Sequence, residues 1–158
     1  LPELGLVVVT AADNYDYNGP DVDALLVTRI LPGLKPALDS RYNGSWYDPA
    51  TNGQGFSLEV LDDRQELVSY WYTYTEAGEK RWFLLQGPVV DGLGQALVYE
   101  TEGGRFLQND PVELVEWGSA VFTPVDCNNL QLRVDSDEMN ISLPLTRLSG
   151  ECFDAPGD

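Results

Sequence analysis

The hexapeptide Ser69-Tyr70-Trp71-Tyr72-Thr73-Tyr74 decides the fold class of this chain. Five of its six residues are aromatic or β-branched, and these residue types favour β-strands. In a strand the three tyrosines share one face, and Trp71 and Thr73 share the other. Because both faces carry aromatic rings, the sequence leaves open which face points into the core.

The same pattern of short strands and turn residues continues on both sides of this hexapeptide. The predicted strands are Ser45–Tyr47, Gly55–Leu61, Leu67–Tyr74, Arg81–Val90, Gln95–Glu102, Val115–Thr123, Leu130–Asp135 and Met139–Leu148. Short links favour antiparallel pairing of consecutive strands, because parallel pairing needs long crossovers. We therefore expect a mainly β protein, either an eight-stranded antiparallel up-and-down barrel or a barrel-like sandwich.

The beginning of the chain has a different character. Leu6-Val7-Val8-Val9-Thr10-Ala11 predicts a buried strand, and Asp21 can cap a helix over residues 22–31. One strand and one helix cannot bury each other's apolar faces, so we expect the barrel or a second chain to cover them, the latter as a homodimer through this segment. The predicted organisation is a remnant of an upstream domain at 1–40, the barrel at 41–153 and a tail at 154–158.

Charge and composition argue against several classes of function. The 158 residues include 9 basic and 26 acidic side chains, a net charge of −17, and no histidine. This charge opposes binding to nucleic acid or to an anionic membrane surface. Without histidine the chain cannot form a Ser-His-Asp or Cys-His triad. We expect no catalysis and no cofactor in this chain; a hydrolase using paired carboxylates, at Asp62-Asp63 or Glu100 and Glu102, is a third hypothesis.

Aromatic residues are the candidates for a ligand surface. Rings in such strands usually fill a β core; as the alternative, they could bind a small molecule, a glycan or a peptide. A filled interior with an exposed aromatic patch would indicate an accessory module, whereas a closed apolar pocket would indicate a carrier. The candidate residues are Trp46, Trp71, Tyr72, Tyr74 and Trp82.

The two cysteines, Cys127 and Cys152, predict a disulfide that ties the end of the chain to the barrel. A disulfide is typical of exported proteins, so we expect a secreted or periplasmic bacterial protein.

The segment containing Asn14, Asp16 and Asn18 has the alternating oxygen ligands of a calcium loop. Leu25 stands where a bidentate glutamate should follow, so we expect a solvated turn and no metal, with calcium as the weaker alternative.

Residues 1–38 resemble the C-terminal strand and helix of serine hydrolases of the class C β-lactamase and penicillin-binding-protein type. The resemblance rests on Leu4-Gly5-Leu6-Val7-Val8-Val9-Thr10-Ala11-Ala12-Asp13-Asn14-Tyr15 and on Arg29-Ile30-Leu31-Pro32. The Ser-x-x-Lys, Tyr-x-Asn and Lys-Thr-Gly motifs of that family do not occur in this chain. The resemblance therefore implies a parent serine hydrolase, with its upstream catalytic domain as a partner, and no catalytic residue in this piece.

Residues 44–152 resemble an uncharacterised β-rich C-terminal module of exported bacterial proteins, through Gly44-Ser45-Trp46-Tyr47-Asp48-Pro49 and Trp71-Tyr72-Thr73-Tyr74. Gly44-x-Trp46-Tyr47 is also similar to the first strand of lipocalin and avidin barrels, where the tryptophan packs across the barrel end. These resemblances imply a non-catalytic accessory module, binding or stabilising, of an exported serine hydrolase. The alternative is a calycin-like barrel that binds a lipid or another hydrophobic ligand.

Overall fold

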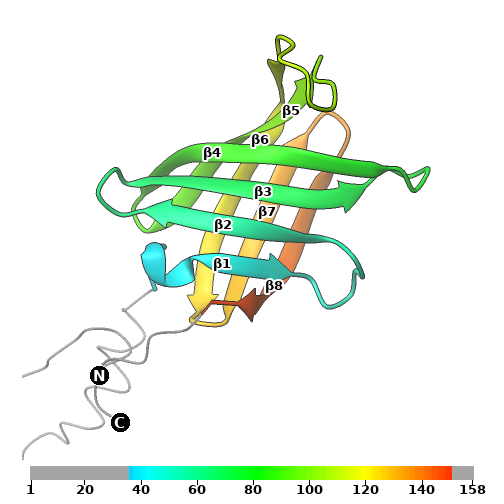
Figure 1. The fold of residues 1–158 in the computed structure, drawn as a ribbon. Coiled ribbons are helices and arrows are strands. Elements are labelled where there is room, and N and C mark those ends of the chain that lie inside the picture. The colour runs from blue at the N-terminus through cyan, green and yellow to red at the C-terminus, as the bar shows by residue number, and fades with distance from the viewer. Residues whose placement is uncertain (1–35, 151–158) are drawn as a thin grey trace, which may run out of the picture. The chain divides into compact units, whose positions relative to one another are not determined.

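The computed structural model describes residues 36–150, which form a closed barrel of eight antiparallel strands (Figure 1). Each strand pairs with its neighbours in sequence, and β8 closes the barrel on β1. The predicted eight-stranded antiparallel up-and-down barrel is confirmed, and the sheet closes as a barrel and not as a sandwich. The elements are a 3₁₀-helix η4 (Ser40–Tyr42) and strands β1 (Gly44–Tyr47), β2 (Gly55–Leu61), β3 (Glu66–Tyr74), β4 (Lys80–Val90), β5 (Leu93–Glu102), β6 (Glu113–Asp126), β7 (Asn129–Ser136) and β8 (Asn140–Ser149).

Several predictions concern residues outside the described range. They are the strand and helix of the first 35 residues, the calcium alternative at Asn14, Asp16 and Asn18, the residue Cys152 and the tail at 154–158. Within residues 36–150, no helix has both the length and the apolar character needed to cross a membrane.

The core comes from one face of each strand, as the period-two alternation of side chains requires. In β7, for example, Leu130, Leu132 and Val134 are almost fully buried, whereas Arg133 between them is exposed. The same alternation resolves the face of β3 that the sequence left open. Trp71 points into the barrel, and the three tyrosines of this strand point outward.

One end of the barrel, which we call the plugged end, is covered by η4 and the residues before it. Leu38 is 3% exposed, and its backbone N–H donates to the carbonyl oxygen of Gly92 at 2.9 Å. Ser40 donates from its backbone N–H to Asp62 at 2.9 Å, which joins η4 to the β2–β3 turn. The barrel unit begins at Ala37, so it includes a few residues of the 1–40 stretch.

Trp46 lies across the plugged end and is only 1% exposed. Its indole N–H donates to the carbonyl of Tyr42 at 2.9 Å, and the two rings stack with centroids 6.0 Å apart. The guanidinium of Arg147 lies over the Trp46 ring. It donates hydrogen bonds to the backbone carbonyl oxygens of Cys127 (2.7 Å) and Arg41 (3.0 Å). A single arginine thus joins β8, η4 and the β6–β7 turn.

Gly44 is needed at the start of β1 because its φ is +138°, a conformation that other residues rarely adopt. A side chain there would also collide with the carbonyl oxygen of Ser149 on the paired strand β8. Gly44 and Trp46 together therefore fix the seam at which the barrel closes.

The turns at the plugged end are short. Asp91 and Gly92 both have positive φ, 52° and 76°, and join β4 to β5 as a two-residue hairpin. Strand β5 therefore begins at Leu93, two residues before the predicted start at Gln95. The opposite end, which we call the mouth, carries the longer connections, including residues 103–112 between β5 and β6 (Figure 1).

Candidate functional site

Four exposed aromatic side chains lie together on the outer wall of the barrel, on β3 and β4. We call Tyr70, Tyr72, Tyr74 and Trp82 the aromatic strip. Their exposed fractions are 41%, 53%, 44% and 43%, in that order. Tyr72 pairs directly with Trp82 across the two strands, and the Tyr70 and Trp82 rings have centroids 6.2 Å apart. The strip is therefore a continuous aromatic surface open to solvent.

The neighbouring strand β2 leaves this surface uncovered. Gly55 pairs with Tyr72, and Ser57 pairs with Tyr70, so the side chains beside the strip are absent or small. The Tyr74 hydroxyl lies beside Gly53, where a larger residue would meet it. Rings and hydroxyl groups are thus presented side by side, a combination of apolar faces and polar edges.

The structure separates the five predicted ligand residues between two faces. Tyr72, Tyr74 and Trp82 lie on the aromatic strip, whereas Trp46 is buried at the plugged end and Trp71 is 5% exposed inside the barrel. A ligand on the outer wall cannot reach these two tryptophans. Tyr70 was not named as a candidate, although its spacing from Tyr72 and Tyr74 already placed it on their face of the strand.

Aromatic rings fill the middle of the barrel. Trp71 stacks on Phe56 and on Phe83, with centroid distances of 5.4 Å and 5.1 Å. Phe83 in turn contacts Trp117 at 4.4 Å, and Phe122 meets Phe56 edge-on at 6.4 Å. These side chains come from β2, β3, β4 and β6, so they bridge the interior from wall to wall.

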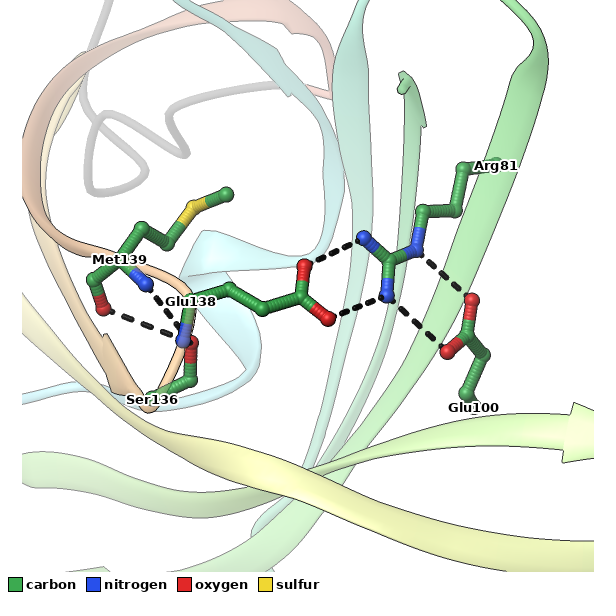
Figure 2. A network of polar contacts seen from close by, with 5 residues as sticks. All are labelled: Arg81, Glu100, Ser136, Glu138 and Met139. Carbon is green, nitrogen blue, oxygen red and sulfur yellow. Dashed lines mark hydrogen bonds and ion pairs between the residues drawn. The ribbon is translucent and has the colours of Figure 1, made fainter. Parts of the chain in front are cut away.

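A network of ion pairs around Arg81 lies at the mouth (Figure 2). The guanidinium donates to Glu100 at 2.7 Å and to Glu138 at 2.8 Å. It also lies over the rings of Phe83 and Trp117, 4.6 Å and 5.3 Å from their centroids. Glu138 belongs to the β7–β8 turn, so Arg81 joins that turn to β4 and β5.

This network holds the carboxylate of Glu138 in the charged form. The hydrogen bond from Arg81 lowers the pKa of Glu138 to about 2. The indole N–H of Trp117 adds to this effect, although it makes no hydrogen bond of normal geometry. The two glutamates raise the pKa of Arg81 above its ordinary value. A general acid needs a raised carboxyl pKa, so Glu138 is poorly suited to that role.

In each of the two acidic pairs proposed from the sequence, one carboxylate already accepts hydrogen bonds from another residue and the second is exposed. Asp62 accepts hydrogen bonds from Ser40, and its neighbour Asp63 is exposed. Glu100 binds Arg81, whereas Glu102 is exposed. Within residues 36–150, no group of three or more His, Cys, Asp or Glu side chains is arranged to hold a metal ion.

Cys127 lies in the β6–β7 turn, and no free cysteine occurs among the described residues. Because Cys152 lies outside the described range, the pairing of the two cysteines stays a prediction.

Comparisons with protein-family profiles, with curated proteins and with solved structures gave no match to this chain. The aromatic strip is therefore interpreted from its own geometry and chemistry.

Proposed function

We propose that this barrel is a non-catalytic accessory module that binds a glycan through the aromatic strip. The observation that carries the proposal is the division of aromatic rings between two faces of the same strands. Trp71 and Phe83 fill the interior, while the adjacent Tyr72 and Trp82 are 53% and 43% exposed. Four large rings left in water on one wall represent apolar surface that a ligand would cover.

The chemistry of the strip suits a sugar. The C–H face of a pyranose ring is apolar and can stack on an aromatic ring, while its hydroxyl groups bond with the polar edges of tyrosine. A peptide that adds as a strand needs an open sheet edge, and this barrel is closed between β8 and β1. The net charge of −17 repels polyanions, so we expect a neutral or cationic polysaccharide.

The setting of the module is a further part of this proposal. The resemblance of residues 1–38 to class C β-lactamase and penicillin-binding-protein-type hydrolases supports a parent serine hydrolase, with the barrel as its C-terminal accessory module. The predicted disulfide of Cys127 and Cys152 supports a secreted or periplasmic location in a bacterium. In this setting the aromatic strip would hold the parent enzyme close to its polysaccharide.

The calycin-like carrier is the second candidate, and the closed eight-stranded barrel favours it. An internal ligand would have to share the barrel with the stacked rings of Phe56, Trp71, Phe83 and Trp117. The aromatic strip therefore supports the accessory module more strongly than the barrel topology supports a carrier.

The proposal can be tested by adsorption to three insoluble polysaccharides: cellulose, chitin and chitosan. We expect the full chain to bind at least one of them. Tyr72→Ala and Trp82→Ala should each weaken that binding by about five- to tenfold, because each removes one stacking ring. Phe106→Ala is the matched control, because Phe106 is an exposed aromatic residue outside the strip.

Absence of adsorption to all three polysaccharides would reject the proposed glycan class. Equal adsorption of wild type and the Tyr72→Ala/Trp82→Ala double variant would show that the strip is not the binding surface. A carrier would instead bind a fatty acid in solution with an affinity that substitutions in the strip do not change.

A further inference from the structure

The loop between β5 and β6 exposes two apolar side chains at its tip. Phe106 and Leu107 are 89% and 86% exposed, the highest fractions among the large hydrophobic residues of the described range. The loop belongs to the mouth and extends beyond the strands of the barrel (Figure 1). Residues 113–116 of β6 are all exposed, so both faces of this strand are in water here. The tip is therefore separate from the barrel core and from the aromatic strip.

An ion pair and a turn flank the two tip residues. Arg105 and Asp110 form a two-pronged ion pair with distances of 2.7 Å and 2.9 Å. The backbone N–H of Gln108 donates to the carbonyl of Arg105 at 3.1 Å, which closes a turn around the two apolar residues. Leu107 has a φ of +55°, a region that a leucine rarely adopts.

Apolar and acidic side chains alternate along the β6 side of this hairpin, whereas its tip carries the two apolar residues and one ion pair. The tip residues are followed by Val112 and Leu114, which are 55% and 56% exposed. The acidic residues of the hairpin stem, all exposed, are Glu102, Glu113 and Glu116. Arg105, the only basic residue between β5 and β6, is neutralised by Asp110. The hairpin therefore presents an apolar tip without net charge, and its stem carries three exposed glutamates beside Val112 and Leu114.

We propose that this tip, formed by Phe106 and Leu107, inserts reversibly into the surface of a zwitterionic lipid bilayer. Two side chains supply far less than the roughly 1,200 Å² that a stable protein–protein interface buries, which disfavours a partner protein or a second copy of this chain. Insertion into a bilayer surface, in contrast, gains free energy from each apolar side chain that leaves water. The acidic stem and the net charge of −17 restrict the tip to bilayers without net negative charge.

The test is co-sedimentation of the full chain with sucrose-loaded vesicles of phosphatidylcholine. We expect the wild type to pellet with the vesicles and Phe106→Ser/Leu107→Ser to partition about tenfold less, since most of the inserted apolar surface is lost. The matched control is Val125→Ser/Leu148→Ser, which removes two exposed apolar residues (56% and 67%) and should partition as the wild type does. Equal melting temperatures of the three proteins would show that the barrels are intact.

Charge gives a second arm of the test. Vesicles with equal parts of phosphatidylcholine and phosphatidylglycerol should bind the wild type more weakly at low salt, and sodium chloride should restore binding by screening. Stronger binding to phosphatidylglycerol would overturn the proposal. So would absence of binding to phosphatidylcholine, equal binding by the tip variant, or a wild-type dimer in sedimentation velocity that the tip variant abolishes. None of these results depends on whether the aromatic strip binds a glycan.

Discussion

Arg147 on β8 places its guanidinium carbon 4.4 Å from the ring centroid of Trp46 on β1. The same guanidinium donates to the carbonyl oxygens of Cys127 and Arg41, so one side chain supports the strand seam and the plugged end. Burial lowers the pKa of the Arg147 guanidinium from its ordinary value. The charged Arg147 side chain can lie against the buried Trp46 because its guanidinium donates to several backbone carbonyl oxygens at once.

Arg147→Ala should destabilise the barrel by about 2–4 kcal/mol, because it removes the cation–π contact and leaves carbonyl oxygens without donors. Arg147→Lys should restore only part of the stability lost in Arg147→Ala, because an ammonium group cannot reproduce the planar fork of guanidinium donors. Urea denaturation monitored by tryptophan fluorescence measures both values. Arg133→Ala is the control, because the Arg133 side chain is 64% exposed. Equal effects at positions 133 and 147 would contradict this account of the plugged end.

Two tryptophans on adjacent strands provide a matched pair for the assignment of faces. Trp71→Ala should cost about 3–5 kcal/mol, because it opens a cavity among the stacked interior rings. Trp82→Ala should cost less than about 1 kcal/mol, because this side chain is 43% exposed on the outer wall. Chemical denaturation of both variants measures the difference. Similar losses of stability would show that the two faces are wrongly assigned.

The mouth network predicts a dependence of stability on pH. The folded-state pKa of Glu138 is about 2, below its ordinary value of 4.5, so its ion pair stabilises the fold fully above pH 4.5. This contribution should disappear as the pH falls from 4.5 to about 2. Glu138→Gln should therefore be less stable than wild type near neutral pH and equally stable near pH 2. Denaturation series across this range, with Asp137→Asn as a control in the same turn, would detect the convergence; a constant difference at all pH values would contradict it.

The excess of acidic residues predicts that salt stabilises the fold. With 26 acidic and 9 basic residues, carboxylates repel one another at low ionic strength, and screening relieves this repulsion. The melting temperature should rise with added sodium chloride. Lithium and potassium chlorides should act equally at equal ionic strength. A much larger effect of one cation would indicate specific cation binding instead of screening.

Reduction tests the predicted Cys127–Cys152 bridge. Closing the intervening stretch of chain should stabilise the fold by roughly 3 kcal/mol, and a reducing agent should lower the melting temperature accordingly. Cys127→Ser should melt at the lower temperature with or without the reductant. An unchanged midpoint on reduction of the wild type would argue against the bridge.

The strands were predictable because alternation and turn residues are local signals. The main discrepancy is β6, which was predicted to end at Thr123 and continues to Asp126. Pro124 usually interrupts a strand, but the register shifts between Pro124 and Asp126, so the missing backbone donor is accommodated. The pairing between β6 and β7 therefore continues past Pro124, a residue type that usually ends a strand.

The orientation of β3 and the contacts of the mouth were not predictable. Ser69, with no hydrophobic side chain, lies on the buried face, whereas Tyr72 lies on the exposed one, so hydrophobicity alone would assign β3 incorrectly. Arg81 and Glu138 are 57 positions apart, and only the closed sheet brings them together. The tip at Phe106 was also missed; the only sequence signal was two apolar residues inside a loop of glycine, proline and polar residues.

The pairing of β8 with β1 has a consequence for protein engineering. The first and last strands of the barrel are direct neighbours, about 5 Å apart in the sheet. A surface loop of a host protein would need to open only by this distance to accept the barrel as an inserted cassette. Equally, a short linker could join the start of β1 to the end of β8, and new termini could be cut in the exposed β3–β4 turn at Gly78, which gives a circular permutant of the barrel.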